Sequence, residues 1–171
     1  SLEDLSEADC DIQIDINIKG VIHGARAGLA ALKAGGGRLI NVASCAGLYG
    51  SPKLAVYSAT KHAVKGLTEA LAVEFKAYGV RVADVLPGLI DTPILPPGAV
   101  EAAPKDGMFR AIPPRAVAEV VWQAYHSDKL HWYVPPELIE LDKAATLTPE
   151  VVRDQFIANG PFAGIDAATK G

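Results

Sequence analysis

The sequence predicts an α/β fold in which helices alternate with the strands of a parallel sheet. Two observations lead to this prediction. Short apolar runs bounded by glycine or proline alternate with longer stretches whose apolar residues recur every three or four positions. The order helix, strand, helix, strand, helix, strand is typical of parallel strands joined by crossover helices. Since 50% of the 171 residues are hydrophobic, we expect a single domain over residues 1–171.

The first two elements have clear boundaries. A helix is predicted over residues 7–34, because Ser6 can cap its start and the glycines at 35–37 end it. Residues 38–44 form a mostly apolar run, which predicts a strand buried on both faces. The next elements are a loop at 45–54, a helix at 55–78, a strand at 80–86 and a proline-rich loop at 89–113. They are followed by a helix at 114–127 and a strand at 131–134. The C-terminal extension at 148–171 should hold one helix, which ends at Gly160-Pro161 and is followed by a loose tail.

The composition excludes several classes of protein. The formal net charge is −4 and no dense run of Lys and Arg occurs, so nucleic acid is not an expected partner. No apolar stretch is long enough to cross a membrane, and the acidic start lacks the order of a signal peptide. Cys10 and Cys45 match no metal-ligand spacing and no disulfide framework, which predicts a cytoplasmic setting and no metal site.

Two strand ends are candidates for a ligand site. Ser44 closes the first predicted strand, and Pro87-Gly88 closes the second. In open parallel sheets, ligands bind beyond the carboxyl ends of the strands. We therefore expect these residues to line one crevice.

A tyrosine and a lysine on the second helix could supply proton transfer. Tyr57 and Lys61 are four positions apart, so they lie on one helix face. Lowering a tyrosine pKa by three units needs about 4 kcal/mol. An ammonium about 5 Å away supplies about 3.3 kcal/mol at an effective dielectric of about 20. Context disfavours the other two pairs with this spacing, Tyr49/Lys53 across a turn-rich segment and Tyr125/Lys129 at a helix end.

These residues resemble the Asn-Ser-Tyr-Lys tetrad of the short-chain dehydrogenase/reductase family. The tetrad would be Asn17, Ser44, Tyr57 and Lys61. The stretches that carry the resemblance are Asp15-Ile16-Asn17-Ile18-Lys19-Gly20, Asn41-Val42-Ala43-Ser44, Tyr57-Ser58-Ala59-Thr60-Lys61 and Pro87-Gly88-Leu89-Ile90-Asp91-Thr92. The resemblance is close over about residues 1–95. It implies a Rossmann-like, doubly wound parallel sheet and an oxidoreductase that uses NAD or NADP on an alcohol or carbonyl substrate.

The family resemblance also implies a role for each residue. Tyr57 would exchange a proton with the substrate oxygen, and Ser44 would hydrogen-bond that oxygen. Lys61 would lower the pKa of Tyr57 and hold the nicotinamide ribose, while Asn17 would position a water of the proton relay. The remaining contacts would be Pro87, Gly88, Ile90 and Thr92 with the nicotinamide, and Leu89 and Leu95 of loop 89–113 with an apolar substrate. Homodimers or homotetramers would form through helices 7–34 and 55–78.

Simpler interpretations compete with these roles. Taken alone, Asn17 could be a surface polar residue, Ser44 a turn cap, Tyr57 a core aromatic, Lys61 a solvated lysine and Thr92 a cap before Pro93. The sequence also lacks the family's glycine-rich turn for the cofactor phosphates, and about four strands that come before it in the family. An alternative is therefore a non-catalytic remnant that acts only in packing or oligomerisation.

Overall fold

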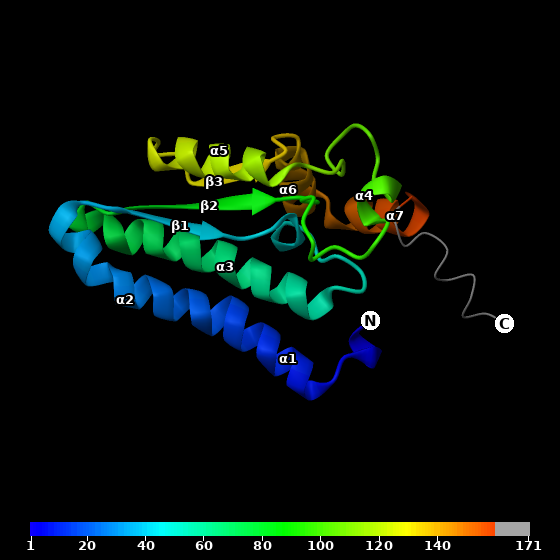
Figure 1. Ribbon diagram of the computed structural model, residues 1–171, viewed down its shortest axis with the longest axis horizontal. Coiled ribbons are helices and arrows are strands. Elements are labelled where there is room, and N and C mark those ends of the chain that lie inside the picture. The colour runs from blue at the N-terminus through cyan, green and yellow to red at the C-terminus, as the bar shows by residue number, and fades with distance from the viewer. Residues whose placement is uncertain (160–171) are drawn as a thin grey trace.

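The computed structural model describes residues 1–159 (Figure 1). The predicted end of the last helix at Gly160-Pro161 and the predicted loose tail lie outside the described residues. The elements in chain order are η1 (Leu2–Asp4), α1 (Glu7–Ile14), η2 (Asp15–Lys19), α2 (Gly20–Gly35), β1 (Arg38–Val42), η3 (Cys45–Gly47), α3 (Ala55–Glu74), η4 (Phe75–Tyr78), β2 (Arg81–Pro87), α4 (Ala99–Ala102), α5 (Pro114–Tyr125), β3 (His131–Val134), α6 (Leu138–Leu147) and α7 (Pro149–Asn159).

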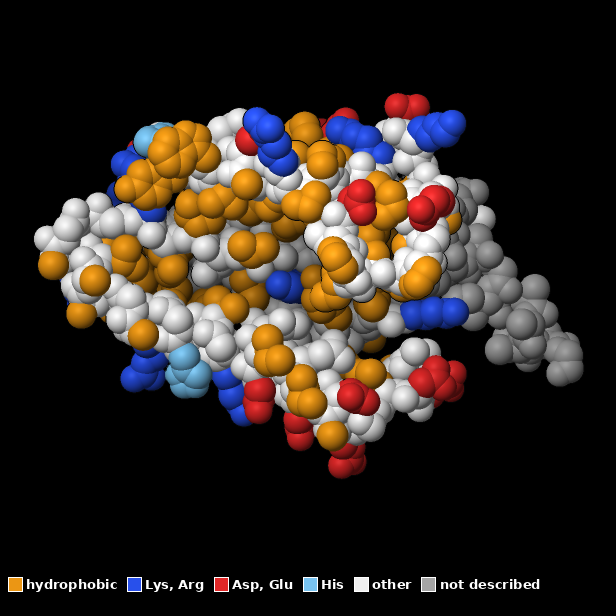
Figure 2. All heavy atoms as spheres, viewed as in Figure 1, with side chains coloured by type: hydrophobic (Ala, Val, Ile, Leu, Met, Phe, Trp, Pro, Cys, Tyr) orange, Lys and Arg blue, Asp and Glu red, His pale blue; other side chains and the backbone are white. Residues whose placement is uncertain are grey.

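The sheet has three parallel strands in the order β1-β2-β3. Figure 1 shows α2 and α3 on one face of this sheet and α5 on the other. The predicted α/β class and the doubly wound arrangement are therefore confirmed. The outer edge of β1 pairs with no other strand of the described residues, and Val42 there is 52% exposed. Figure 2 shows hydrophobic side chains gathered on the face where this edge lies.

The core forms on both faces of the central strand. Leu86 of β2 packs with Val64 of α3 and Leu138 of α6, and all three side chains are almost completely buried. On the other face, Val85 packs with residues of α5. The central strand β2 is buried along its length after Arg81 and includes the buried Asp84. Burial on both faces was predicted for the first strand, and that prediction is wrong: β1 is mostly half-buried, because its outer side has no neighbouring strand among the described residues and Val42 is 52% exposed.

The structure differs from the predicted elements in several places. The helix predicted over 7–34 is interrupted by the π-helical turn η2, because the chain inserts a wider turn between α1 and α2. The first strand ends at Val42 and not at 44, since Ser44 instead caps the short helix η3. Helix α6 was not predicted, and loop 89–113 contains the short helix α4. No helix within residues 1–159 is both long and apolar enough to cross a membrane.

Candidate active site

The carboxyl ends of β1 and β2 lie at one edge of the sheet. Val42 pairs with Val85, so Ser44 and Gly88 both lie just beyond this edge. The backbone N–H of Gly88 donates to the Val134 carbonyl at 2.7 Å. A Cβ at Gly88 would lie 3.4 Å from that oxygen and from the Leu138 Cδ1, so a larger residue would crowd this turn. Gly88 thus lies where the strand end and α6 approach closely.

Tyr57 and Lys61 lie near the start of α3, at the same edge. The Lys61 Nζ is 5.6 Å from the centre of the Tyr57 ring. It also donates a hydrogen bond of 3.0 Å to the carbonyl oxygen of Val42, the last residue of β1. This bond satisfies a carbonyl at the open edge of the sheet and holds the lysine beside the strand end that leads to Ser44.

Ser44 has two polar neighbours. It is buried, and its Oγ accepts a hydrogen bond of 3.2 Å from the Ala46 N–H, so the cap foreseen as the simpler interpretation is present. Its hydroxyl also lowers the pKa of Tyr57, which indicates that it lies near the phenol. The cap fixes the Ser44 side chain close to the phenol, so the structural role and a chemical role are compatible.

Gly47 is a site residue that the sequence analysis did not identify. A Cβ at this position would lie 2.7 Å from the carbonyl oxygen of Lys61 and 2.9 Å from its carbonyl carbon. Only glycine lets η3 lie directly on the backbone of α3. The turn that follows Ser44 is thereby held against the helix that carries Tyr57 and Lys61. Its sequence signal was a glycine three residues after a strand-end serine, which is also typical of an ordinary turn.

Burial controls the electrostatics of the pair. It raises the pKa of Tyr57 above the ordinary value, although the Ser44 hydroxyl lowers it in part. Burial also lowers the pKa of Lys61. The net shift of the Tyr57 pKa is therefore upward, because desolvation of the phenolate outweighs the favourable contacts made to it. The expected effect of Lys61 on this pKa stays a prediction.

Asn17 lies in the π-helical turn η2 and faces α3. Its Nδ2 donates to the Oγ1 of Thr60 at 3.1 Å. Thr60 is 1% exposed, and its hydroxyl donates to the Tyr57 carbonyl at 2.7 Å. Thr60 immediately precedes Lys61, so Asn17 is tied to the segment between the tyrosine and the lysine. A π-turn at this position fits the tendency of such turns to occur at functional sites.

The segment after Gly88 continues along the same edge. Ile90 forms a parallel bridge with Ile112, which closes loop 89–113 at its base. The Thr92 hydroxyl donates to the Ile90 carbonyl at 3.3 Å, so its side chain does not act as an N-terminal cap here. Leu89 and Leu95 are half-buried. Ile90 and Thr92 thus follow the Pro87-Gly88 turn and are half-buried, whereas Pro93 and Ile94 are exposed.

Two other features lie apart from these residues. A cavity of about 460 Å³ is lined by Arg38, Arg81 and Leu130 among others, so it lies at the amino ends of the strands and holds none of the tetrad. Within residues 1–159 no group of three or more His, Cys, Asp or Glu side chains could hold a metal ion.

Comparison with known proteins identifies the family. The family model described as short chain dehydrogenase matches residues 1–99. The cyclohexanol dehydrogenase of Acinetobacter sp. (strain SE19) is 42% identical over 96 residues, which are 56% of this chain and 38% of that protein. The oxidoreductase UcpA of Escherichia coli (strain K12) is 38% identical over 127 residues, 70% of this chain and 48% of that protein. The chain thus spans about half the length of these relatives or less.

A solved structure has the same arrangement. A short chain dehydrogenase from Burkholderia cenocepacia J2315, in complex with NADP, superposes with a TM-score of 0.75 at 26% sequence identity. The superposition covers 88% of this chain and 60% of that one. The match of the family model to more than half of the chain, together with this fold, shows that the chain belongs to the short-chain dehydrogenase family.

Proposed function

We propose that the chain carries the catalytic residues of an NAD(P)-dependent oxidoreductase that interconverts an alcohol and a carbonyl compound. The observation that supports this most is the Lys61 ammonium, which lies 5.6 Å from the centre of the Tyr57 ring and donates a hydrogen bond to the strand end that leads to Ser44. Two hydroxyl groups from different elements thus converge at the carboxyl edge of the sheet, where ligands of such folds bind.

The proposed roles follow from the hydroxyl groups and the ammonium. Tyr57 gives a proton to the carbonyl oxygen during reduction and takes it back during oxidation. The Ser44 hydroxyl donates a hydrogen bond to the same oxygen and stabilises its developing charge. Lys61 holds ribose hydroxyls and favours the phenolate. Because burial raises the pKa of Tyr57, formation of the phenolate near neutral pH needs this cation and a further positive charge.

The residues at this edge fit the nicotinamide end of the cofactor. The cofactor would supply or accept the hydride, and in its oxidised form it would bring a positive charge to the site. Pro87 and Gly88 would form the wall beside the ring, while Ile90 and Thr92 would hold its carboxamide. No glycine-rich turn joins a strand to a helix within residues 1–159, so the residues described here serve the nicotinamide and ribose alone.

The proposed substrate is a small apolar alcohol or ketone. Loop 89–113 contributes Leu89 and Leu95 to the substrate side, and Ile94 beside them is 88% exposed. The name of the Acinetobacter relative, a cyclohexanol dehydrogenase, agrees with a substrate of this class. We also propose a cytoplasmic location, because both cysteines of the described residues are free thiols.

We propose self-association through α1, α2 and α3 as a homodimer or homotetramer. Ile12 and Ile16 on this helical layer are 56% and 66% exposed, and Val73 of α3 is 77% exposed. Figure 2 shows hydrophobic side chains along α1 among acidic ones. Exposed apolar side chains of this density suit a helix-pair interface between copies of the chain.

Substitution of Tyr57 tests the catalytic proposal. Tyr57→Phe keeps the ring and its packing but cannot transfer a proton, so turnover of cyclohexanol with NAD⁺ or NADP⁺ should fall by about 10²-fold or more. Tyr125→Phe is the matched control, because Tyr125 is half exposed at the end of α5 and also precedes a lysine by four residues. Its turnover should stay near that of the unchanged protein. A Tyr57→Phe protein within tenfold of the unchanged one would refute the assignment.

The alternative is a non-catalytic role in packing or oligomerisation. It is favoured by the lack of a glycine-rich, phosphate-binding turn between a strand and a helix within residues 1–159. Calorimetric titration of the 171-residue chain with NAD⁺ and NADP⁺ separates the two proposals. Binding that weakens in Lys61→Ala supports the enzyme. A folded chain that binds neither nucleotide supports the role in packing or oligomerisation.

A further inference from the structure

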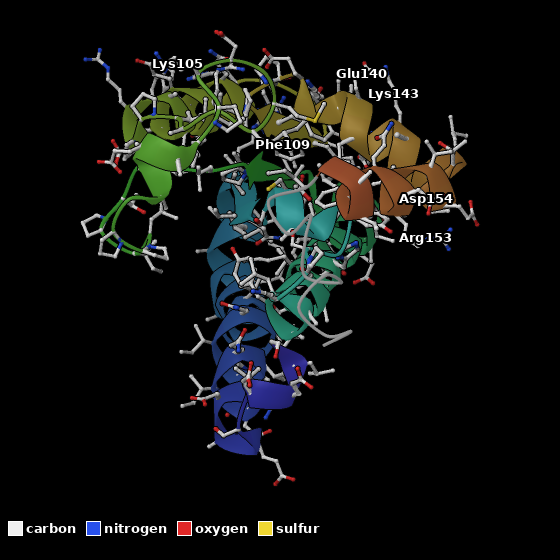
Figure 3. All side chains as sticks on the ribbon, turned by 90° about the vertical axis from the view of Figure 1, so that its right-hand side faces the viewer. Lys105, Phe109, Glu140, Lys143, Arg153 and Asp154 are labelled. Carbon is white, nitrogen blue, oxygen red and sulfur yellow. The ribbon has the colours of Figure 1, made fainter. Side chains whose placement is uncertain are left out.

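Three aromatic side chains from distant segments meet on the side of the molecule that carries the candidate site. Tyr49 follows η3, Phe109 lies late in loop 89–113 and Phe156 lies on α7. The rings of Tyr49 and Phe156 are stacked, with centres 5.5 Å apart and planes at 23°. Phe109 meets Phe156 edge-on at 6.2 Å and 76°. Figure 3 looks onto this side, with Phe109 labelled between the loop and α7.

This aromatic group is continuous with the candidate site. Tyr49 packs in one hydrophobic cluster with Cys45 and Leu48, and Cys45 directly follows Ser44. Cys45 also acts electrostatically on Tyr57, which places both near one another. The short helix η3 thus connects Ser44 to Tyr49, and ring contacts continue from Tyr49 to Phe156 and from Phe156 to Phe109. These three rings form the aromatic wall.

The aromatic group is held in place from behind. Val152, one turn before Phe156 on α7, is 2% exposed and anchors the helix in the core. In Figure 3 the side chains of Arg153 and Asp154 point outward from α7, where they form an ion pair of 2.9 Å. Next to Phe109, Arg110 pairs with Glu137 at 2.9 Å and fixes the end of the loop. Phe109 itself is 44% exposed, so part of a fixed ring surface stays open.

We propose that Tyr49, Phe109 and Phe156 determine substrate specificity and favour ketones and alcohols that carry a planar aromatic ring close to the reacting carbon. This inference rests on the proposed function, because it assigns the substrate class of the same site. Aromatic rings prefer stacked or edge-on contacts with other rings, and such contacts add affinity beyond the apolar area that they bury. A flexible chain of equal carbon number gains the burial but not the ring contact.

Two ketones of eight carbons test the preference. Acetophenone and 2-octanone are reduced with NADPH, and the ratio of their kcat/KM values is measured in the unchanged protein, in Phe109→Leu and in Phe156→Leu. Leucine keeps the side chain apolar but removes the ring. The ratio should favour acetophenone in the unchanged protein and fall about two- to tenfold in each variant. The exposed position of Phe109 keeps this arm usable if Phe156→Leu does not fold.

Phe75→Leu is the matched control. Phe75 also pairs with a neighbouring ring, that of Tyr78 at 6.5 Å, but it lies in a separate core cluster at the other end of α3. Its substitution should lower the melting temperature without changing the ratio. If Phe109→Leu and Phe156→Leu behave like Phe75→Leu, the rings only pack α7 against the body and the inference is wrong.

A second measurement separates this inference from the proposed function. Saturation-transfer NMR reports binding of acetophenone and of 2-octanone to the chain without any turnover. If no ketone is reduced but acetophenone binding weakens in both variants, the aromatic wall stands and the proposed function fails. If both ketones are reduced equally well and NMR shows no ring dependence, the proposed function stands and the aromatic wall is overturned.

Discussion

Gly47→Ala tests whether the contact between η3 and α3 sets the geometry of the candidate site. Replacing glycine by alanine at an unstrained position stabilises a protein by about 0.4–1 kcal/mol, because the unfolded chain loses freedom. At Gly47 the added Cβ would stand 2.7 Å from the Lys61 carbonyl oxygen and 2.9 Å from the carbonyl carbon. Both atoms belong to a helix backbone, so no flexible side chain can move aside. Overpacking of this kind costs about 1–3 kcal/mol.

The overlap should therefore outweigh the entropic gain, with a net loss of about 1–2 kcal/mol. The assay is urea unfolding, supported by thermal unfolding, where each kcal/mol lowers the melting temperature by about 2–4 °C. Turnover should fall further than stability does, because the backbone shift also separates Ser44 from Tyr57, and a misplacement of about 1 Å can cost about 10²-fold.

Gly24→Ala is the control for this substitution. Gly24 lies within α2, and a Cβ there would meet nothing within 4 Å. The same change should stabilise the chain by about 0.5–1 kcal/mol, because alanine is the better helix former. A Gly47→Ala protein as stable as the unchanged chain, or stabilised like Gly24→Ala, would refute the argument that η3 depends on this close approach.

Three further substitutions have defined outcomes. Lys53 has a positive φ of 63°, which a lysine adopts at a cost of about 1–2 kcal/mol, so Lys53→Asn should raise the unfolding free energy by up to about 1 kcal/mol in urea titrations. Asp84 is completely buried, and burial raises its pKa above 3.8; the folded chain therefore keeps this proton to a higher pH than the unfolded chain. The free energy of unfolding should therefore fall as pH rises from 3.8, because Asp84 loses its proton less readily in the folded chain. In Asp84→Asn, urea unfolding at several pH values should show a smaller fall of this free energy than in the unchanged chain. Parallel pH dependences for the two proteins would contradict this sign. Lys61→Ala removes the cation beside Tyr57, so the alkaline rise of the pH–rate profile should move to higher pH, and an unmoved profile would argue against this role.

Much of the secondary structure and part of the site could be predicted from local sequence. The strand His131–Val134 has the predicted bounds, and the helix that begins at Ala55 starts where the apolar period begins. The rule that ligands bind beyond strand ends brought Ser44 and Gly88 to one edge, and the parallel register of β1 and β2 agrees with it. These features depend on residue spacing along a single segment, so the sequence carries them directly.

Other local features had no clear signal. The π-helical turn Asp15–Lys19 has the same apolar spacing as the α-helices beside it, so a helical period alone could not separate the two. Helix α6 follows Pro135-Pro136, and its short Leu and Ile run also suits a strand or a loop.

The sequence by itself determined the alternation of helices and strands and the residue types that suit proton transfer. Only the tertiary structure decided that Gly47 must lack a side chain, that Thr60 ties Asn17 to α3, and that the rings of Tyr49 and Phe156 stack. It also decided the direction of the Tyr57 pKa, since burial outweighs the lowering effect of Ser44. Each of these features depends on how closely segments far apart in the chain approach one another and on how much water they exclude, and neither quantity is set by the spacing of residues within one segment.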